Sequence, residues 1–149
     1  MYEETKTVFV LIGAGGHASV AASTAATIGL KISLVALPDG LSEHAHFSSV
    51  KYLTDEELLS QKNNQDFRLI NGIGKTIKSD SRACVFNKFK SHGFEFQNLI
   101  HPFAYVDPSA HLFEGVQVMA GAIIQNDCSI GENSIVNTKA SVDHGCIIG

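Results

Sequence analysis

Glycines surround a histidine in the segment GAGGHA, residues 13–18, which directly follows the apolar run TVFVLI at residues 7–12. Glycines let a chain turn sharply after a strand, and the free N–H groups at the start of the next helix can bind phosphate oxygens. The segment therefore predicts a turn that binds the phosphates of a nucleotide; a tight turn that binds nothing is the alternative. The residues predicted to contact a substrate here are Gly13, Gly15, Gly16 and His17.

The same segment also fits the dinucleotide pattern GxGxxA through Gly13, Gly15 and Ala18. Asp39 follows further along the chain, close to the position about 20 residues on where that pattern expects a ribose-binding acid. The first part of the chain, taken alone, therefore leaves open an NAD-dependent oxidoreductase. His17 favours a different ligand, because the dinucleotide pattern requires no histidine at this place.

His144 is the residue that best suits the role of a catalytic base. Its imidazole titrates near neutrality, so it can accept a proton from an attacking amine or hydroxyl. The residue lies in the second place of a six-residue unit, DHGCII, where we expect a corner from which the side chain projects outward. An ordinary surface histidine is the alternative.

These residues need elements to position them, and the first hundred residues predict a small α/β layer. Short β-branched runs alternate with segments of helical character, an order typical of a doubly wound parallel sheet. The expected strands lie at residues 7–12, 32–37 and 66–74, and the expected helices at residues 18–29, 54–60 and 79–93. Thr54 and Glu57 have the spacing of a capping box at the start of the second helix.

From His101 onward the sequence repeats every six residues. The sixth place always holds a branched aliphatic residue, namely Val106, Leu112, Val118, Ile124, Ile130, Val136, Val142 and Ile148. The fourth place always holds a small or slim residue, from Ala104 to Cys146. Neither a helix nor an ordinary strand has this period, whereas a solenoid with three short strands per turn does. We expect each aliphatic residue to stack on its counterpart eighteen residues away.

The two regions together resemble the bacterial sugar acyltransferases that carry hexapeptide repeats. That family includes UDP-4-amino-sugar N-acetyltransferases and sialic acid O-acetyltransferase-like proteins. The motifs that carry the resemblance are VLIGAGGHA (10–18), Ile73-Gly74, NLIHPFAYVDPSA (98–110) and IVNTKASVDHGCIIG (135–149). The resemblance implies a Rossmann-like nucleotide-sugar-binding domain over residues 1–97 and a left-handed parallel β-helix over residues 98–149. It also implies a homotrimer, with acetyl-CoA held between neighbouring β-helices.

The resemblance also implies roles for single residues. His144 matches the catalytic histidine, Asp39 would lie near the uracil end of the nucleotide, and Ile73 and Gly74 would line the same pocket. One position departs from the family, which commonly has an acidic residue directly after the histidine, because Gly145 stands there. Asp143 precedes the histidine, but neighbouring residues in an extended chain point to opposite sides.

The hexads run to Ile148-Gly149, at the end of the printed sequence. The resemblance implies further coils that would supply most acetyl-CoA contacts and a backbone N–H for the thioester oxygen. The sequence is therefore expected to be either a fragment of a longer protein or a shortened relative that has lost activity.

Composition narrows the classes of function. The formal net charge is −4, and 44% of residues are hydrophobic, with no apolar run near the ~20 residues needed to span a bilayer. Nucleic acid is therefore not expected as a partner, and insertion into a membrane is not expected either. Three cysteines without metal-type spacing fit the reducing cytoplasm. No metal is expected, since His44 and His46 have no third ligand nearby.

Several other residues are expected to have structural roles. Cys128 and Cys146 lie eighteen residues apart and should stack inside the solenoid, and Cys84 is expected to be buried on its helix. A solvated helix face would explain the scattered cations Lys75, Lys78, Arg82, Lys88 and Lys90.

The sequence predicts an acetyl-CoA-dependent acetyltransferase that acts on the amine, or the hydroxyl, of a nucleotide-linked sugar for surface glycan biosynthesis. A UDP-4-amino sugar is the favoured acceptor, and a sialic acid is the close alternative. A non-catalytic nucleotide-sugar-binding or assembly module is the second hypothesis. An NAD-dependent oxidoreductase is the third, and it leaves the hexads without a purpose.

Overall fold

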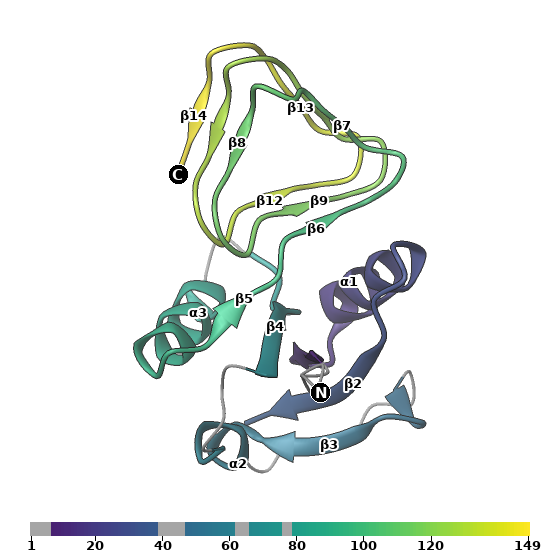
Figure 1. Cartoon of the computed structure of the whole chain (residues 1–149), viewed down its shortest axis with the longest axis vertical. Helices are drawn as coiled ribbons and strands as arrows, with labels where there is room; N and C mark the ends of the chain where they lie inside the picture. Colours follow the sequence, from purple (N-terminus) through teal and green to yellow (C-terminus); the bar gives the residue numbers. More distant parts are fainter. Residues whose placement is uncertain (1–6, 39–46, 62–65, 76–78) are drawn as a thin grey trace, which may run out of the picture.

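The computed structural model describes residues 7–38, 47–61, 66–75 and 79–149. A parallel sheet with its helices forms one part, and a three-sided coil of short strands sits against one edge of it (Figure 1). Directly after the last strand of the sheet, short strands follow one another every six residues, as the hexads do. The description below therefore takes the sheet first and the coil second.

Five parallel strands form the sheet among the described residues, in the order β3-β2-β1-β4-β5. They are β1 (Val8–Ile12), β2 (Ile32–Leu37), β3 (Lys51–Thr54), β4 (Phe67–Asn71) and β5 (Glu95–Phe96). The three strands predicted from the sequence are confirmed as β1, β2 and β4. The two outer strands β3 and β5 were not predicted, because each is short and lacks a clear β-branched run.

Helices cover both faces of this sheet. They are α1 (Gly16–Thr27), α2 (Asp55–Leu59) and α3 (Ser81–Ser91). Successive residues of a strand face opposite sides, so Leu11 of β1 packs toward α1 while Val10 and Ile12 pack toward α2 and α3. Small side chains such as Ala21 and Ala25 let α1 lie close to the strands.

The predicted capping box at the start of α2 is present. The Glu57 backbone N–H donates to the Thr54 hydroxyl oxygen at 3.0 Å, and the Thr54 backbone N–H donates to the Glu57 carboxylate at 2.7 Å. Both groups would otherwise lack partners at a helix start, which explains why this short helix begins at Asp55.

The hexads form a parallel β-helix with three faces (Figure 1). The faces are the sheets β6-β9-β12, β7-β10-β13 and β8-β11-β14. Their strands are β6 (Leu99–Ile100), β7 (Tyr105–Val106), β8 (His111–Leu112), β9 (Gln117–Val118), β10 (Ile123–Ile124), β11 (Ser129–Ile130), β12 (Ile135–Val136), β13 (Ser141–Val142) and β14 (Ile147–Ile148). This arrangement fits the expected left-handed parallel β-helix.

The register confirms the predicted stacking. Ile124 pairs with both Val106 and Val142, each eighteen residues away, and the aliphatic sixth places fill the interior together with the small fourth places. Cys128 is buried and Cys146 half-buried in this core, as predicted. The core of the coil therefore follows from the six-residue period of the sequence.

One face of the β-helix lies against the α/β layer. Leu99 of β6 belongs to the same buried cluster as Leu11 and the α1 alanines, and Gln117 of β9 is fully buried. The other two faces leave apolar side chains in solvent, among them Phe103, Tyr105 and Ile147. The two parts therefore share a buried, partly polar junction.

Two predictions about side chains were wrong. Cys84 is exposed on α3 rather than buried. Arg82 is 3% exposed and does not lie on a solvated face, because its side chain points from α3 into the junction with the β-helix. No helix among the described residues has both the length and the apolar character to cross a membrane.

Candidate functional site

The glycine turn packs against the loop after β4. Gly13 has φ +88°, and a Cβ atom built on it would lie 2.7 Å from Cδ1 of Ile73. Its backbone N–H donates to the Ala36 carbonyl at 2.8 Å, which fixes the end of β1 against β2. Since a side chain at this position meets both a strained backbone and a close neighbour, glycine is required here. The structure thus brings the predicted residues Gly13 and Ile73 together.

The start of α1 lies beside this turn, and its first N–H groups have no partner in the part of the chain that the structure describes. Ser19 is the first residue to donate within the helix, to the Gly15 carbonyl, so the N–H groups before it have no intrahelical acceptor. Gly15 at the N-cap has no side chain to cap them. A Cβ atom on Gly15 or Gly16 would meet nothing within 4 Å. The helix start therefore presents free donors to open space, which suits an anion.

His17 is the side chain at this helix start, and it joins the two parts of the molecule. Its Nε2 lies 2.7 Å from Oε1 of Gln117 on β9. A Cβ atom on Gly74 would lie 3.2 Å from Cβ of His17, so the Ile73-Gly74 loop passes directly beside it. Burial lowers the pKa of His17 below its ordinary value, the hydrogen bond with Gln117 partly opposes this, and the charge of Arg82 adds a smaller lowering. His17 is therefore held in its neutral form at neutral pH.

A buried polar network continues from Gln117 behind the Ile73-Gly74 loop. Nε2 of Gln117 donates to the Asn71 carbonyl at 2.9 Å, and the Asn71 side chain accepts from the Ile73 N–H at 3.1 Å. The Asn71 amide also donates to Oδ1 of Asn133 in the β-helix at 3.0 Å. Because each of these groups is paired, the loop beside His17 is held in one conformation.

Arg82 anchors the same loop from α3. Nη1 donates to the carbonyls of Asn71 and Ile73 at 2.9 and 2.7 Å, and Nε donates to the Asn133 carbonyl at 2.8 Å. Nη2 has no hydrogen-bond partner among the described residues. Burial lowers the pKa of Arg82 to about 10, so the guanidinium stays charged at neutral pH. One cation thus ties the β4 loop, α3 and the β-helix together.

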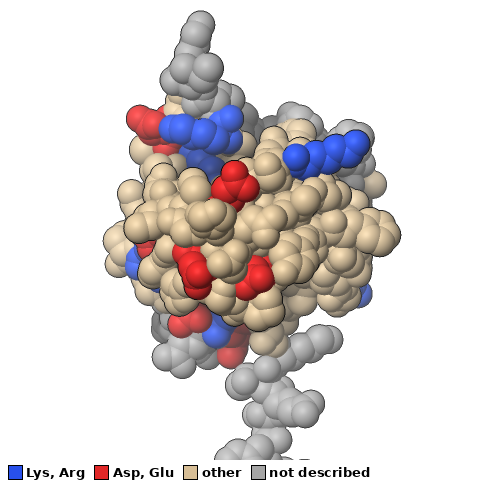
Figure 2. All heavy atoms as spheres, turned by 90° about the horizontal axis from the view of Figure 1, so that it is seen from above, with Lys and Arg blue, Asp and Glu red and all other residues tan. Residues whose placement is uncertain are grey.

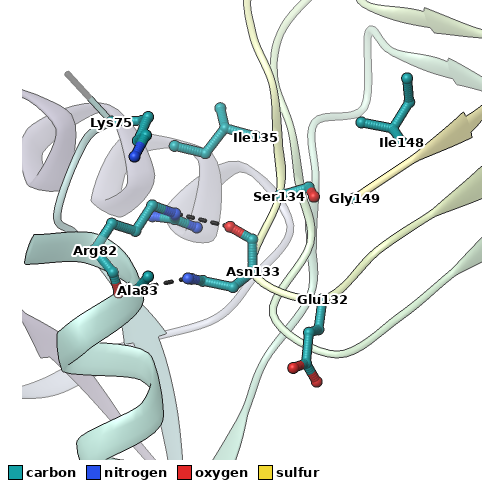
Figure 3. A pocket seen from close by; sticks show the side chains of 9 residues that line it. All are labelled: Lys75, Arg82, Ala83, Glu132, Asn133, Ser134, Ile135, Ile148 and Gly149. Atoms are coloured by element: carbon teal, nitrogen blue, oxygen red, sulfur yellow. Dashed lines mark hydrogen bonds between the residues drawn. The ribbon is translucent and has the colours of Figure 1, made fainter. Parts of the chain in front are cut away.

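A pocket of about 350 Å³ is lined in part by Arg82 (Figure 3). It lies between the start of α3 and the β-helix. The residues that line it are Lys75, Arg82, Ala83, Glu132, Asn133, Ser134, Ile135, Ile148 and Gly149. In Figure 3 the Lys75 and Arg82 side chains lie on the α/β side, and Ile135 and Ile148 lie on the β-helix side. None of the predicted site residues that the structure describes lines this pocket.

His144 lies apart from the glycine turn. It is exposed in the turn between β13 and β14, and this turn forms the corner of the β-helix that faces away from the α/β layer (Figure 1). The predicted corner position is confirmed, and Gly145 after it has φ +67°. No hydrogen bond among the described residues holds the His144 side chain, while the Asp143 carbonyl accepts from Sγ of Cys128 at 3.0 Å. One chain therefore presents two separate groups of predicted site residues.

Some predicted residues lie outside the described ranges. Asp39, His44 and His46 fall within residues 39–46, of which nothing is described. Among the described residues, no three His, Cys, Asp or Glu side chains are grouped so that they could hold a metal ion.

Solved structures match this architecture closely. The acetyltransferase domain of PglB from Neisseria gonorrhoeae, in complex with acetyl coenzyme A, is 30% identical, with a TM-score of 0.80 over 95% of this chain and 67% of that one. PerB from Caulobacter crescentus, in complex with CoA and GDP-perosamine, is 36% identical, with a TM-score of 0.79 over 94% of this chain and 64% of that one. The chain belongs to the hexapeptide-repeat sugar acetyltransferase family. No family model matches it.

Membership in the sugar acetyltransferase family confirms the expectation of an acyltransferase. A histidine-to-asparagine variant of perosamine N-acetyltransferase from Caulobacter crescentus, in complex with CoA and GDP-perosamine, is 35% identical to this chain, with a TM-score of 0.80 over 94% of this chain and 64% of that one. The chain spans about two thirds of the length of these structures.

Sequence reasoning missed the residues of the polar network, above all Gln117 and Arg82. The sequence held a weak signal for Gln117. The residue at the fifth place of a hexad points outward from the coil. On the face formed by β6, β9 and β12, the residues at the same place as Gln117 are Leu99 and Ile135. An apolar outward column indicates a covered face, where a polar residue must find a partner. Arg82 carried no such signal, because its partners are backbone carbonyls.

Proposed function

We propose that this protein transfers the acetyl group of acetyl-CoA to the amine of a nucleotide-linked sugar, as a step in surface glycan biosynthesis in the cytoplasm. A UDP-4-amino sugar is the first candidate acceptor, and transfer to a sugar hydroxyl is the variant of the same reaction. The observation that carries the proposal is the pairing of a glycine–histidine turn with a hexad β-helix in one chain. The solved structures that match this chain, at a TM-score of about 0.8, are acetyltransferases in complex with acetyl-CoA or with CoA and GDP-perosamine.

The α/β part, residues 1–97, would bind the nucleotide. The free N–H groups at the start of α1 would hold the diphosphate, since the helix dipole favours negative charge there. Gly13 and Gly15 let the backbone approach the phosphates, with Gly16 and His17 in the first helical turn. Ile73 and Gly74 would line the same site, which their packing against Gly13 and His17 supports. Asp39 would contact the base end of the nucleotide.

The β-helix, residues 98–149, would carry the chemistry through His144. The acceptor amine would attack the thioester carbonyl, so that a C–N bond forms and the C–S bond breaks. His144 would take the proton lost by the amine and pass it to the leaving thiolate, so that CoA leaves as the thiol. A positioned base of this kind contributes about 10²- to 10⁴-fold in rate. The exposed corner position of His144 supports this role, because a substrate can reach it.

Assembly into a homotrimer would bring the two groups of residues together. Within one chain the His144 corner faces away from the α/β layer (Figure 1). The β-helix exposes apolar residues, of which Phe103 is 81% and Ile147 is 84% exposed. Viewed from the β-helix side, much of the surface is uncharged (Figure 2). Packing against neighbouring copies would bury such residues and place His144 of one copy near the substrate of another.

A non-catalytic module that binds nucleotide sugars is the second candidate function. Two observations favour it: Gly145 replaces the acidic residue common after the catalytic histidine of the family, and the His144 side chain has no hydrogen bond among the described residues. Such a protein would keep the α1 site and lack turnover.

Thiol release from acetyl-CoA, measured with a panel of UDP- and GDP-linked amino sugars, tests the proposal. We expect release that requires one acceptor class, with the acetylated sugar identified by mass spectrometry. His144→Asn should lower the rate by at least about 100-fold. His111→Asn, which changes another exposed β-helix histidine, is the matched control and should keep the wild-type rate.

Two results would contradict the proposal. Turnover in the His144→Asn variant at the wild-type rate would remove His144 from the mechanism. No release with any acceptor, from a chain that still binds nucleotide sugars, would favour the binding module.

A further inference from the structure

The orientation of the Gln117 amide is fixed by its surroundings. A backbone carbonyl can only accept a hydrogen bond, so the atom of Gln117 that lies 2.9 Å from the Asn71 carbonyl must be its NH₂ group. The amide oxygen of Gln117 therefore faces His17. Gln117 is fully buried, so water does not compete for either group.

This orientation determines which nitrogen of His17 carries the proton. Since the Gln117 oxygen can only accept, Nε2 of His17 must donate to it across 2.7 Å. In a neutral imidazole the other nitrogen, Nδ1, then holds a lone pair. Nδ1 has no hydrogen-bond partner among the described residues. His17 itself belongs to the first turn of α1.

The charges around His17 favour this neutral state. Among the described residues, Arg82 in α3 is the charged group that acts on the ring, and its positive charge opposes protonation of His17. The neighbours that touch His17 from the β-helix and from the loop after β4, Gln117 and Gly74, are uncharged. Burial adds to the same effect. Without a carboxylate among these neighbours, His17 is poorly suited to act as a cation for phosphate.

We propose that Gln117 is a positioning residue that holds His17 neutral with the proton on Nε2, so that Nδ1 accepts a hydrogen bond from a hydroxyl or N–H group of the bound nucleotide sugar. This inference rests on the proposed function for the identity of the ligand. The phosphate oxygens are left to the backbone N–H groups of α1, which lie in the same helical turn. A lone pair on Nδ1 would repel a phosphate oxygen and attract a hydroxyl hydrogen.

The state of His17 in the free 149-residue chain can be tested by ¹⁵N NMR of the imidazole rings, with His17→Asn used to assign its signals. We expect a neutral ring with the proton on Nε2 at pH 7 and a pKa below the ordinary value of about 6.5. Gln117→Glu should raise the pKa of His17 by at least about one unit, because a carboxylate stabilises the protonated ring. Gln117→Met should remove the fixed tautomer. Gln125→Met, which changes an exposed glutamine, should leave the His17 signals unchanged.

The ligand contact can be tested by the pH dependence of binding. GDP-mannose and UDP-N-acetylglucosamine are suitable probes, because their diphosphate diesters do not titrate near neutrality. Protonation would turn Nδ1 from an acceptor into a donor, so we expect the affinity to fall as the pH is lowered through the pKa of His17 that the NMR titration gives. His17→Asn should remove this dependence.

Each outcome decides part of the proposal. An affinity that rises on acidification would mean that His17 pairs with phosphate and would overturn the Nδ1 contact. A His17 ring with its proton on Nδ1, or a pKa at or above 6.5, would overturn the role of Gln117. If no probe binds at any pH while the NMR result is as expected, the proposed nucleotide-sugar site is wrong and the positioning by Gln117 stands.

Discussion

The β-helix and the glycine-turn region are built on opposite principles. In the β-helix each core residue meets the residue at the same hexad place eighteen residues away, as Ile124 does with Val106 and Val142. Around the glycine turn each contact is unique and joins distant parts of the chain, as His17 does with Gln117. Periodic contacts can be read from the sequence, whereas unique contacts depend on how the two parts dock.

The same difference separates residues of one type. Gln117 and Gln125 both belong to the β-helix, yet Gln117 is buried at the junction and Gln125 is exposed. A period assigns each residue a direction relative to the coil, but it does not say which face of the coil is covered. The loss in the free energy of unfolding on substitution should therefore depend on whether a residue lies in the junction or the core, and not on its type.

The largest expected effect is at the junction, from Arg82→Met. The substitution leaves the carbonyls of Asn71, Ile73 and Asn133 without their charged donor, and buried acceptors without partners are costly. We expect a loss of about 3–5 kcal/mol in the free energy of unfolding, measured by urea denaturation. Lys75→Met, which removes an exposed ion pair nearby, should change stability little. A loss of similar size in both variants would contradict the assigned role of Arg82.

Within the β-helix, Ile130→Ala should cost about 2–5 kcal/mol, since this side chain is fully buried in the core. Ile148 is its register partner in the last coil and is 40% exposed. Ile148→Ala should therefore cost clearly less in the same denaturation experiment. Equal losses at the two positions would show that burial of the hexads is uniform along the coil.

A smaller loss is expected from Gln117→Met. Nε2 of His17 would lose its acceptor and the Asn71 carbonyl would lose one of its two donors, which should cost about 1–3 kcal/mol in the free energy of unfolding. The matched variant Gln125→Met should leave stability unchanged, because this side chain is exposed. Differential scanning calorimetry on both variants measures the two losses. A Gln117→Met protein as stable as the unchanged chain would contradict the contribution of these junction hydrogen bonds to stability.

The smallest expected effect on stability is that of Gly145→Asp. The backbone there has φ +67°, but Asp127 occupies the corresponding place one coil earlier with φ 56°, so the cost should be about 1 kcal/mol. An acidic residue after His144 restores the family pattern and should raise the rate of acetyl transfer. Gly121→Asp, at φ +71°, should carry a similar stability cost without any gain in rate. An equal gain from both variants would contradict a link to His144.

The sequence allowed most of the architecture to be predicted. The strand at residues 32–37 has the predicted bounds, and the helical segment at residues 79–93 contains α3. The sixth-place aliphatic residues form the core that the period demands, apart from Ile148 at the last coil. These features succeed because they depend on local propensity or on a fixed period.

The candidate site was predicted less completely. The glycine turn and the Ile73-Gly74 loop were recognised as motifs, and the structure brings them together. The hydrogen bonds of Gln117 and Arg82 were not foreseen, because they form only when the β-helix docks on the α/β layer. The wrong assignment of Arg82 to a solvated face has the same cause, since a cation that binds backbone carbonyls needs no acidic partner in the sequence.

Calorimetric titration of a nucleotide-linked amino sugar into the His144→Asn and Gly13→Ala variants tests the central claim most directly. We place binding in the glycine turn and chemistry in the β-helix, so His144→Asn should bind as tightly as the unchanged chain. Gly13→Ala should bind at least about tenfold more weakly, because its side chain would strain φ +88° and displace Ile73. Loss of binding in His144→Asn, together with full binding in Gly13→Ala, would contradict this division of roles.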